Sequence, residues 1–233
     1  MRNSNVYAVP GFLGSIHDWD PFNFDLTPVK TDQFSSNNFN EWAAGFNAFV
    51  ESKKQANPIL MGYSLGGRLG LHALIQKPFL WKGGIIISAH PGLISSEIRN
   101  ERLMKDLYWA KRFKEERWDG LMQAWEAQEV FKHDSFSFIR PEGDCCRRYL
   151  SDCLDSFSLG RQEDLRHKIE ELPMPILWVI GEKDRKLIEA GGIMNFKHPF
   201  SCTVVLKEAG HRAPWAQPEL FRKAIESFLQ KIL

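Results

Sequence analysis

The stretch PILMGYSLGGRLGLHALIQ, residues 58–76, decides the fold class of this chain. An apolar run precedes GYSLG at residues 62–66, which reads G-x-S-x-G, and the pattern of a helix follows from Leu65. A strand, a tight turn carrying a serine and a helix together form a nucleophile elbow, which exposes the serine hydroxyl beside the helix N-terminus. We therefore predict that Ser64 is catalytic, with an ordinary loop serine as the alternative.

Apolar runs typical of strands occur throughout the chain, at residues 5–12, 29–34, 58–64, 83–90, 175–184 and 202–211. The runs IIIS and ILWVI show no alternation, as in strands that are buried on both faces of a sheet. Helix-like segments lie between the runs, at residues 40–55, 65–76, 186–195 and 219–233. This order predicts an α/β fold with a mostly parallel central sheet flanked by helices.

Residues 94–172 interrupt the alternation, because no convincing strand occurs there. Helical patterns cover residues 96–114, 117–128, 144–155 and 162–171. We interpret residues 94–172 as an inserted helical cap above the carboxyl ends of the strands, where open α/β sheets bind ligands. Residues 1–93 and 173–233 then form the two parts of one α/β core.

Composition narrows the function classes. The 233 residues carry 30 Lys+Arg against 29 Asp+Glu, so nothing favours nucleic acid or an anionic membrane as a partner. We see no secretory signal and no apolar run long enough to cross a bilayer, and we expect a cytoplasmic protein without membrane insertion. The cysteines at 145, 146, 153 and 202 match no usual zinc pattern and are expected to be reduced thiols. No dinucleotide, phosphate-loop or metal motif occurs, so no cofactor or metal is expected, and the oligomeric state stays open.

Two further polar residues end apolar runs downstream of the serine. Asp184 ends PILWVIGEKD and His211 ends CTVVLKEAGH. Taken singly, these residues suit a capping aspartate and a surface histidine, but jointly they predict a Ser-His-Asp triad in the chain order Ser64, Asp184, His211. The backbone N–H groups of Leu65, and of Phe12 in the loop PGFLGS, are the predicted oxyanion donors.

These motifs resemble the α/β-hydrolase superfamily and, more narrowly, its menaquinone-pathway synthases of 2-succinyl-6-hydroxy-2,4-cyclohexadiene-1-carboxylate. The resemblance rests on GFLGS with Asp18-Trp19, GYSLGGR, HPGL at 90–93, WAKRF at 109–113, GEKD and AGH. It implies an enzyme that eliminates pyruvate from 2-succinyl-5-enolpyruvyl-6-hydroxy-3-cyclohexene-1-carboxylate, with the triad acting as a base. Two departures are Pro10, where the family usually has His, and Arg212-Ala213-Pro214-Trp215 after the histidine.

The resemblance also implies a small-molecule polycarboxylate partner, because that substrate carries three carboxylates. Arg68 lies one helical turn after Ser64, and Arg102 occupies the position of a substrate-binding arginine in the family. For a third arginine we choose Arg140, with Arg147 or Arg148 as alternatives. Trp125 and Tyr63 match family aromatic residues at the pocket. Solvated surface charges and apolar cap packing are the alternative interpretations of these side chains.

Three functions therefore remain open from the sequence. The first is the pyruvate-eliminating lyase. The second is a related carboxylic-ester or carbon–carbon bond hydrolase with the same triad, which makes no demand on Arg68 and Arg102. The third is a non-catalytic binding protein of the same fold, which would be marked by a broken triad, whereas all three triad residues are present.

Overall fold

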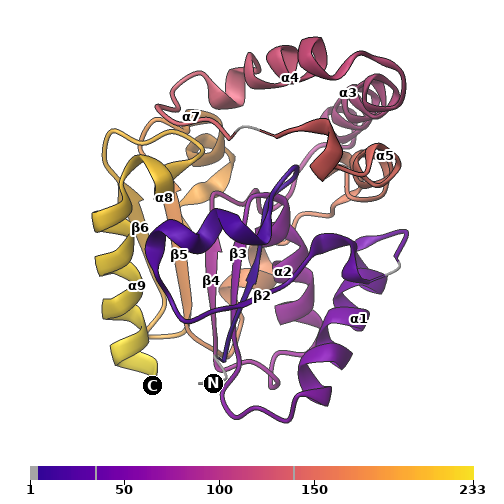
Figure 1. The fold of residues 1–233 in the computed structure, drawn as a ribbon. Helices are drawn as coiled ribbons and strands as arrows, with labels where there is room; N and C mark the ends of the chain where they lie inside the picture. Colours follow the sequence, from indigo (N-terminus) through magenta and orange to yellow (C-terminus); the bar gives the residue numbers. More distant parts are fainter. Residues whose placement is uncertain (1–4, 35, 139) are drawn as a thin grey trace.

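A central sheet of six parallel strands with helices on both faces forms the body of the protein in this computed structural model (Figure 1). The structure describes residues 5–34, 36–138 and 140–233. The strands lie in the order β2-β1-β3-β4-β5-β6. Their bounds are β1 Val6–Val9, β2 Thr27–Pro28, β3 Ile59–Tyr63, β4 Gly83–Ile87, β5 Ile176–Gly181 and β6 Cys202–Leu206. The predicted fold class is confirmed.

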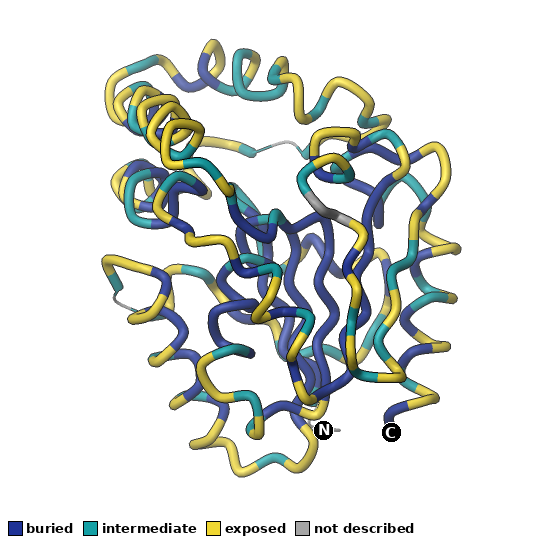
Figure 2. The backbone as a smooth tube through the Cα atoms, turned by 180° about the vertical axis from the view of Figure 1, so that it is seen from behind, coloured by how far each residue is buried: buried dark blue, intermediate teal, exposed yellow. Residues whose placement is uncertain are grey.

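The residues of the central strands are buried along their length (Figure 2). Because neighbouring residues of a strand point to opposite faces, both faces of the sheet are covered. Leu60, Ile86 and Trp178 belong to one apolar cluster, which includes residues of α1 Phe39–Ser52 and α2 Leu65–Gln76. Met61 and Val179 belong to a second cluster on the other face, with residues of α9 Pro218–Ile232. This arrangement explains why the central strands are apolar at every position.

Three helices of the intervening segment lie above the carboxyl ends of the strands (Figure 1). They are α3 Ser96–Glu115, α4 Trp118–Glu126 and α5 Arg147–Ser156. They share an apolar cluster of their own, against which Phe12 and Leu13 of the core pack. The helical content predicted for this segment is confirmed, while its treatment as a separate cap with boundaries at 93 and 172 stays a prediction.

The remaining helices are shorter. The other α-helices are α6 Arg166–Glu170, α7 Arg185–Leu187 and α8 Ala213–Ala216. Several 3-10 turns also occur, of which the longest, η1 Ile16–Phe22, follows β1. None of the helices in the described ranges is long and apolar enough to span a membrane.

Three sequence predictions of secondary structure are wrong in extent. No strand lies within the predicted range 29–34, because the two-residue edge strand β2 ends before it and a 3-10 turn begins at Thr31. The Val29 N–H still bonds the Ala8 carbonyl at 2.9 Å. The helix predicted at 186–195 is the short α7 followed by a π-helical turn, Ile188–Gly192. The helix predicted at 162–171 is limited to α6.

Candidate active site

Ser64 lies at the apex of the turn between β3 and α2, with φ +50° and ψ −111°. This backbone conformation is strained for a residue with a side chain, and it is held by close approaches at the neighbouring glycines. A Cβ on Gly62 would lie 2.5 Å from the Gly66 carbonyl oxygen, and a Cβ on Gly66 would lie 2.3 Å from the Pro10 carbonyl oxygen. Only glycine fits these positions, so the G-x-S-x-G pattern has a steric cause.

The three predicted triad residues are in hydrogen-bond contact. Asp184 follows β5 and His211 follows β6, and His211 Nδ1 lies 2.7 Å from Asp184 Oδ2. Because a carboxylate only accepts, Nδ1 carries the proton and donates it to Asp184. The other ring nitrogen, Nε2, then has a free lone pair and lies 3.0 Å from Ser64 Oγ. This arrangement lets His211 accept the hydroxyl proton of Ser64.

The loop after β1 lies beside the serine. A Cβ on Gly11 would lie 3.4 Å from Ser64 Cβ, so this loop and the start of α2 approach each other closely. The Gly14 N–H closes the turn on the Gly11 carbonyl at 2.9 Å, and Leu13 has a left-handed φ of +58°. The assignment of the Phe12 and Leu65 N–H groups as oxyanion donors stays a prediction.

Two cavities meet at the triad. The larger, about 980 Å³, lies under α4 and the loop that carries Arg140. The smaller, about 250 Å³, lies between α2, α3 and the loop after β5. Five residues line both: Phe12, Ser64, Trp125, Phe131 and His211. A ligand in either cavity therefore reaches the Ser64 hydroxyl.

Four cationic side chains, Arg68, Arg102, Lys105 and Lys186, line the smaller cavity together with three acidic ones, Asp106, Glu129 and Asp184. Arg68 Nη1 donates to Gln162 Oε1 at 3.4 Å, and within the described residues no carboxylate comes within ion-pair distance of this guanidinium. Burial and the nearby charge of Arg102 lower the pKa of Arg68 to about 9, so it remains a cation at neutral pH. A half-buried cation without a carboxylate partner favours an anionic ligand.

Arg102 is placed on the same cavity by α3. Its Nε donates to both carboxylate oxygens of Asp106, at 2.9 and 3.0 Å, and Asp106 also accepts from Ser158 Oγ at 2.7 Å. These bonds hold the guanidinium through Nε and involve neither of its terminal nitrogens. The predicted pair Arg68 and Arg102 is thus brought together at one cavity.

The other predicted arginines lie elsewhere. Arg140 lines the larger cavity, where it binds Asp18. Arg147 lines the same cavity but donates to Glu142 and to two backbone carbonyls. Arg148 is 90% exposed beside Asp152. Arg140 is thus separated from the cavity that holds Arg68.

The two predicted aromatic residues both lie at the triad. Trp125 packs on Phe12 with ring centroids 4.9 Å apart and lines both cavities. Tyr63 lies 5.7 Å from the His211 ring and 4.8 Å from the Trp215 ring. Burial raises the pKa of Tyr63 well above its usual range, so its hydroxyl stays neutral.

Sequence reasoning did not single out His90 or Phe131 as site residues. His90 lines the smaller cavity, and its Nδ1 accepts the Gly92 N–H at 3.1 Å. Burial and Arg68 lower the His90 pKa to about 4, so the ring is neutral and carries its proton on Nε2. Its place in HPGL was a usable signal, whereas Phe131 had none beyond a general apolar pattern.

Comparison with known proteins identifies the family of this chain. The model of the alpha/beta hydrolase family matches residues 5–224 of this chain. The chain belongs to the alpha/beta hydrolase family. Within this family, the 2-succinyl-6-hydroxy-2,4-cyclohexadiene-1-carboxylate synthase of Serratia proteamaculans (strain 568) is 30% identical over 98% of this chain and 89% of its own length. The narrower resemblance predicted from the motifs is therefore confirmed.

Two solved structures share the alpha/beta hydrolase fold of this chain. MenH from S. aureus superposes with a TM-score of 0.85, at 21% identity, covering 98% of this chain and 94% of that one. A thermophilic esterase from Thermogutta terrifontis superposes with a TM-score of 0.68, at 18% identity, covering 97% and 89%. At these identities the likeness concerns the fold alone.

Proposed function

We propose that this enzyme is a carbon–oxygen lyase that eliminates pyruvate from 2-succinyl-5-enolpyruvyl-6-hydroxy-3-cyclohexene-1-carboxylate. The product is 2-succinyl-6-hydroxy-2,4-cyclohexadiene-1-carboxylate. The observation that carries the proposal is the junction of a hydrogen-bonded triad with a cavity in which Arg68 lacks a carboxylate partner among the described residues. The relative from Serratia proteamaculans, which bears the name of the synthase forming this product, supports the same conclusion.

The positions of the double bonds define the reaction. The substrate has its ring double bond at carbon 3, and the product has double bonds at carbons 2 and 4. A proton must therefore leave carbon 2 and the enolpyruvyl oxygen must leave carbon 5. The proton on carbon 2 is acidic because this carbon bears the succinyl ketone. The enzyme needs a base for this proton and hydrogen-bond donors for the ketone oxygen.

The triad supplies the base in this proposal. Ser64 and His211 accept the proton from carbon 2, which ends on His211 Nε2, and Asp184 stabilises the resulting imidazolium. The electron pair of the broken C–H bond forms the double bond at carbon 2, the old double bond moves to carbon 4, and the C–O bond at carbon 5 breaks. Pyruvate leaves as its enolate and takes one proton at carbon, which restores the neutral His211.

Backbone N–H groups and arginine side chains stabilise the negative charges in this proposal. The N–H groups of Phe12 and Leu65 are the proposed donors to the ketone oxygen while it carries enolate charge. Arg68 and Arg102 are the proposed partners of substrate carboxylates, because a guanidinium binds a carboxylate through two parallel hydrogen bonds. Trp125 and Tyr63 are the proposed apolar walls beside the reacting ring. The ligand is a small-molecule polycarboxylate, and the proposed location is the cytoplasm, in keeping with four free cysteines.

A carboxylic-ester or carbon–carbon bond hydrolase is the second candidate. Its support is the 3.0 Å contact between Ser64 Oγ and His211 Nε2, which also suits attack of the serine on a carbonyl carbon. This function would give no role to the guanidinium of Arg68, which has no carboxylate partner among the described residues. The lyase accounts for both the triad and the cations, so the geometry favours it.

One assay separates the two candidates. The enolpyruvyl substrate is supplied, pyruvate release is followed with lactate dehydrogenase, and short-chain nitrophenyl esters are tested in parallel. Rapid pyruvate release with slow ester cleavage is the expected result. Ester turnover without pyruvate release would replace the lyase by the hydrolase.

A further inference from the structure

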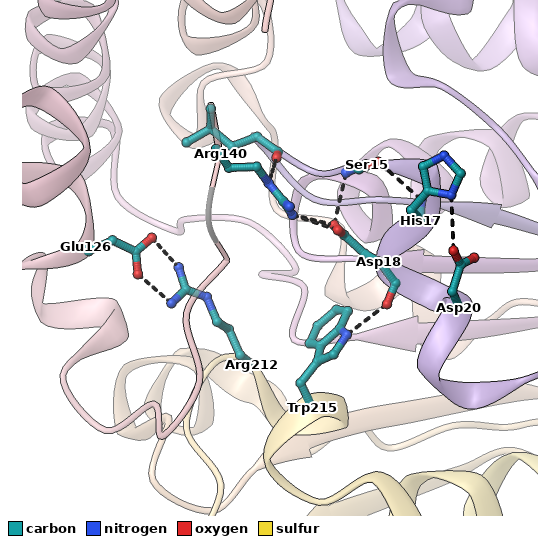
Figure 3. A network of polar contacts seen from close by, with 9 residues as sticks. Ser15, His17, Asp18, Asp20, Glu126, Arg140, Arg212 and Trp215 are labelled. Carbon is teal, nitrogen blue, oxygen red and sulfur yellow. Dashed lines mark hydrogen bonds and ion pairs between the residues drawn. The ribbon is translucent and has the colours of Figure 1, made fainter. Parts of the chain in front are cut away.

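Arg140 binds two groups of the loop that follows β1, although it belongs to the segment between the two parts of the core (Figure 3). Its Nη2 donates to both carboxylate oxygens of Asp18, at 2.7 and 2.8 Å, and its Nε donates to the Leu13 carbonyl at 2.5 Å. Both side chains are largely buried, at 15% exposure for Arg140 and 7% for Asp18. Two of the three guanidinium nitrogens, Nε and Nη2, are thus bound to groups of the protein.

The groups that Arg140 binds control the backbone of the predicted oxyanion loop. Leu13 directly follows Phe12 and has a φ of +58°, a conformation that L-residues avoid unless their surroundings impose it. Asp18, the second partner of Arg140, accepts the Ser15 N–H at 3.0 Å. One ion pair therefore holds the loop on both sides of Gly14.

Asp18 has a third hydrogen-bond partner besides Arg140 and Ser15. Trp215 Nε1, from the helix just after His211, donates to the Asp18 carbonyl at 2.9 Å (Figure 3). The Arg140 guanidinium also stacks over the Phe138 ring, 4.3 Å from its centroid. These contacts leave neither partner free to rotate away without breaking others. A substrate carboxylate would have to displace Asp18 to form a two-bond pair with Arg140.

We infer that Arg140 and Asp18 are positioning residues, which fix the loop so that the Phe12 N–H points to the reacting oxygen. Arg140 acts through Leu13 and Asp18 and is not a ligand of the substrate. Because Arg140 comes from the intervening helical segment, the oxyanion loop reaches its working shape only when that segment is seated on the core. This inference rests on the proposed lyase function for its kinetic consequence, whereas its structural part is independent of the reaction.

The test compares Asp18→Asn, Arg140→Gln and the double variant with the wild type. The control is Arg161→Gln, which removes a guanidinium from an exposed pair with Asp155 outside both cavities at the triad. Hydrogen–deuterium exchange of the peptide covering residues 10–18 reports the loop, in which the Gly14 and Ser15 amides are hydrogen-bonded. Pyruvate release gives kcat and KM separately.

The expected result is exchange at least about tenfold faster in this peptide for both single variants, with no change in the control. The value of kcat should fall about ten- to a hundredfold while KM stays within about threefold, and the double variant should resemble the single variants. Should Arg140→Gln fail to fold, Asp18→Asn and Arg140→Lys supply the same comparison, since a lysine cannot bind Asp18 and Leu13 as a fork.

Two results would overturn the inference. One is unchanged exchange of residues 10–18 in the variants, which would limit the pair to a general effect on stability. The other is a raised KM in Arg140→Gln with wild-type kinetics in Asp18→Asn, which would make Arg140 a substrate ligand. A wild-type protein that releases no pyruvate would defeat the proposed function alone, because the exchange data would still decide the role of the pair.

Discussion

Arg212, the residue directly after His211, binds both carboxylate oxygens of Glu126, the residue directly after Trp125, at 2.6 and 2.7 Å (Figure 3). The Arg212 side chain is only 6% exposed. Its backbone N–H also bonds Asp134 Oδ1 at 2.9 Å. This pair therefore links the loop that carries the triad histidine to the helix that places Trp125 over the serine.

Glu126→Gln should lower the free energy of unfolding by about 1–3 kcal/mol, because it leaves the Arg212 guanidinium buried with a weaker partner. It should also lower kcat, since the link between the sequence neighbours of His211 and Trp125 is weakened. Urea unfolding and pyruvate release measure the two effects. The matched control is Glu51→Gln, from the exposed pair with Lys77 outside both cavities. Equal stability of the two variants would show that the Arg212 contact contributes little.

Ser64→Ala should reduce kcat/KM for pyruvate release by at least about a thousandfold, because His211 loses the hydroxyl through which it acts. The thermal midpoint should stay near that of the wild type, since Ser64 Oγ makes its described contact with His211 alone. Ser52→Ala on the exposed end of α1 serves as the control. Substantial activity in Ser64→Ala would place the base elsewhere.

Arg102→Ala should weaken recognition of the tricarboxylate by about ten- to a hundredfold, the value of a hydrogen bond to a charged group. Turnover of a neutral nitrophenyl ester, if any is detectable in the wild type, should stay nearly the same. The ratio of KM values for the two substrates measures the effect. Arg148→Gln is the control, because Arg148 is 90% exposed. An equal loss on both substrates would contradict a carboxylate-binding role.

The stability of the protein should fall as the pH is lowered from about 6.5 to about 4, because burial and Arg68 lower the pKa of His72 to about 4. In this interval the unfolded chain binds a proton at His72 that the folded chain does not, so stability rises with pH by at most about 1.4 kcal/mol per unit for this group. Urea unfolding between these pH values measures the slope.

His72→Phe should flatten that pH dependence, because it removes the ring that titrates. The His72 and Phe39 ring centroids lie 4.5 Å apart, and a phenylalanine ring preserves this stacking. His17→Gln is the control, because His17 is exposed. An unchanged slope in His72→Phe would assign the acid sensitivity to other groups, of which His90 has the same direction of shift.

Gly66→Ala should destabilise the protein by about 1–3 kcal/mol or more and abolish activity, because its Cβ would lie 2.3 Å from the Pro10 carbonyl oxygen. Gly120→Ala in α4 is the matched substitution, since no atom lies within 4 Å of its Cβ. That change should stabilise the helix by about 0.5–1 kcal/mol. Thermal unfolding of both variants tests the steric explanation of the serine turn.

Most of the sheet and the triad could be predicted from local patterns. The strands at 59–63, 83–87 and 176–181 are buried on both faces, and this burial requires the continuous apolar runs that reveal them. The triad residues follow from their place directly after such runs. The short edge strand β2 and the broken helix after Asp184 were less predictable, because tertiary contacts rather than periodicity end these elements.

Local patterns were enough to indicate the parallel fold and the serine turn, because hydrophobic periodicity and the clash that a Cβ on Gly62 would make with Gly66 involve residues close together in the chain. Only the folded structure shows the partners of the arginines. Arg68 faces the smaller cavity without a carboxylate partner in the described part of the chain, whereas Arg140 binds Asp18, 122 residues away along the chain. The physical reason is the long, flexible arginine side chain, whose final partner depends on which charged groups the fold brings within reach.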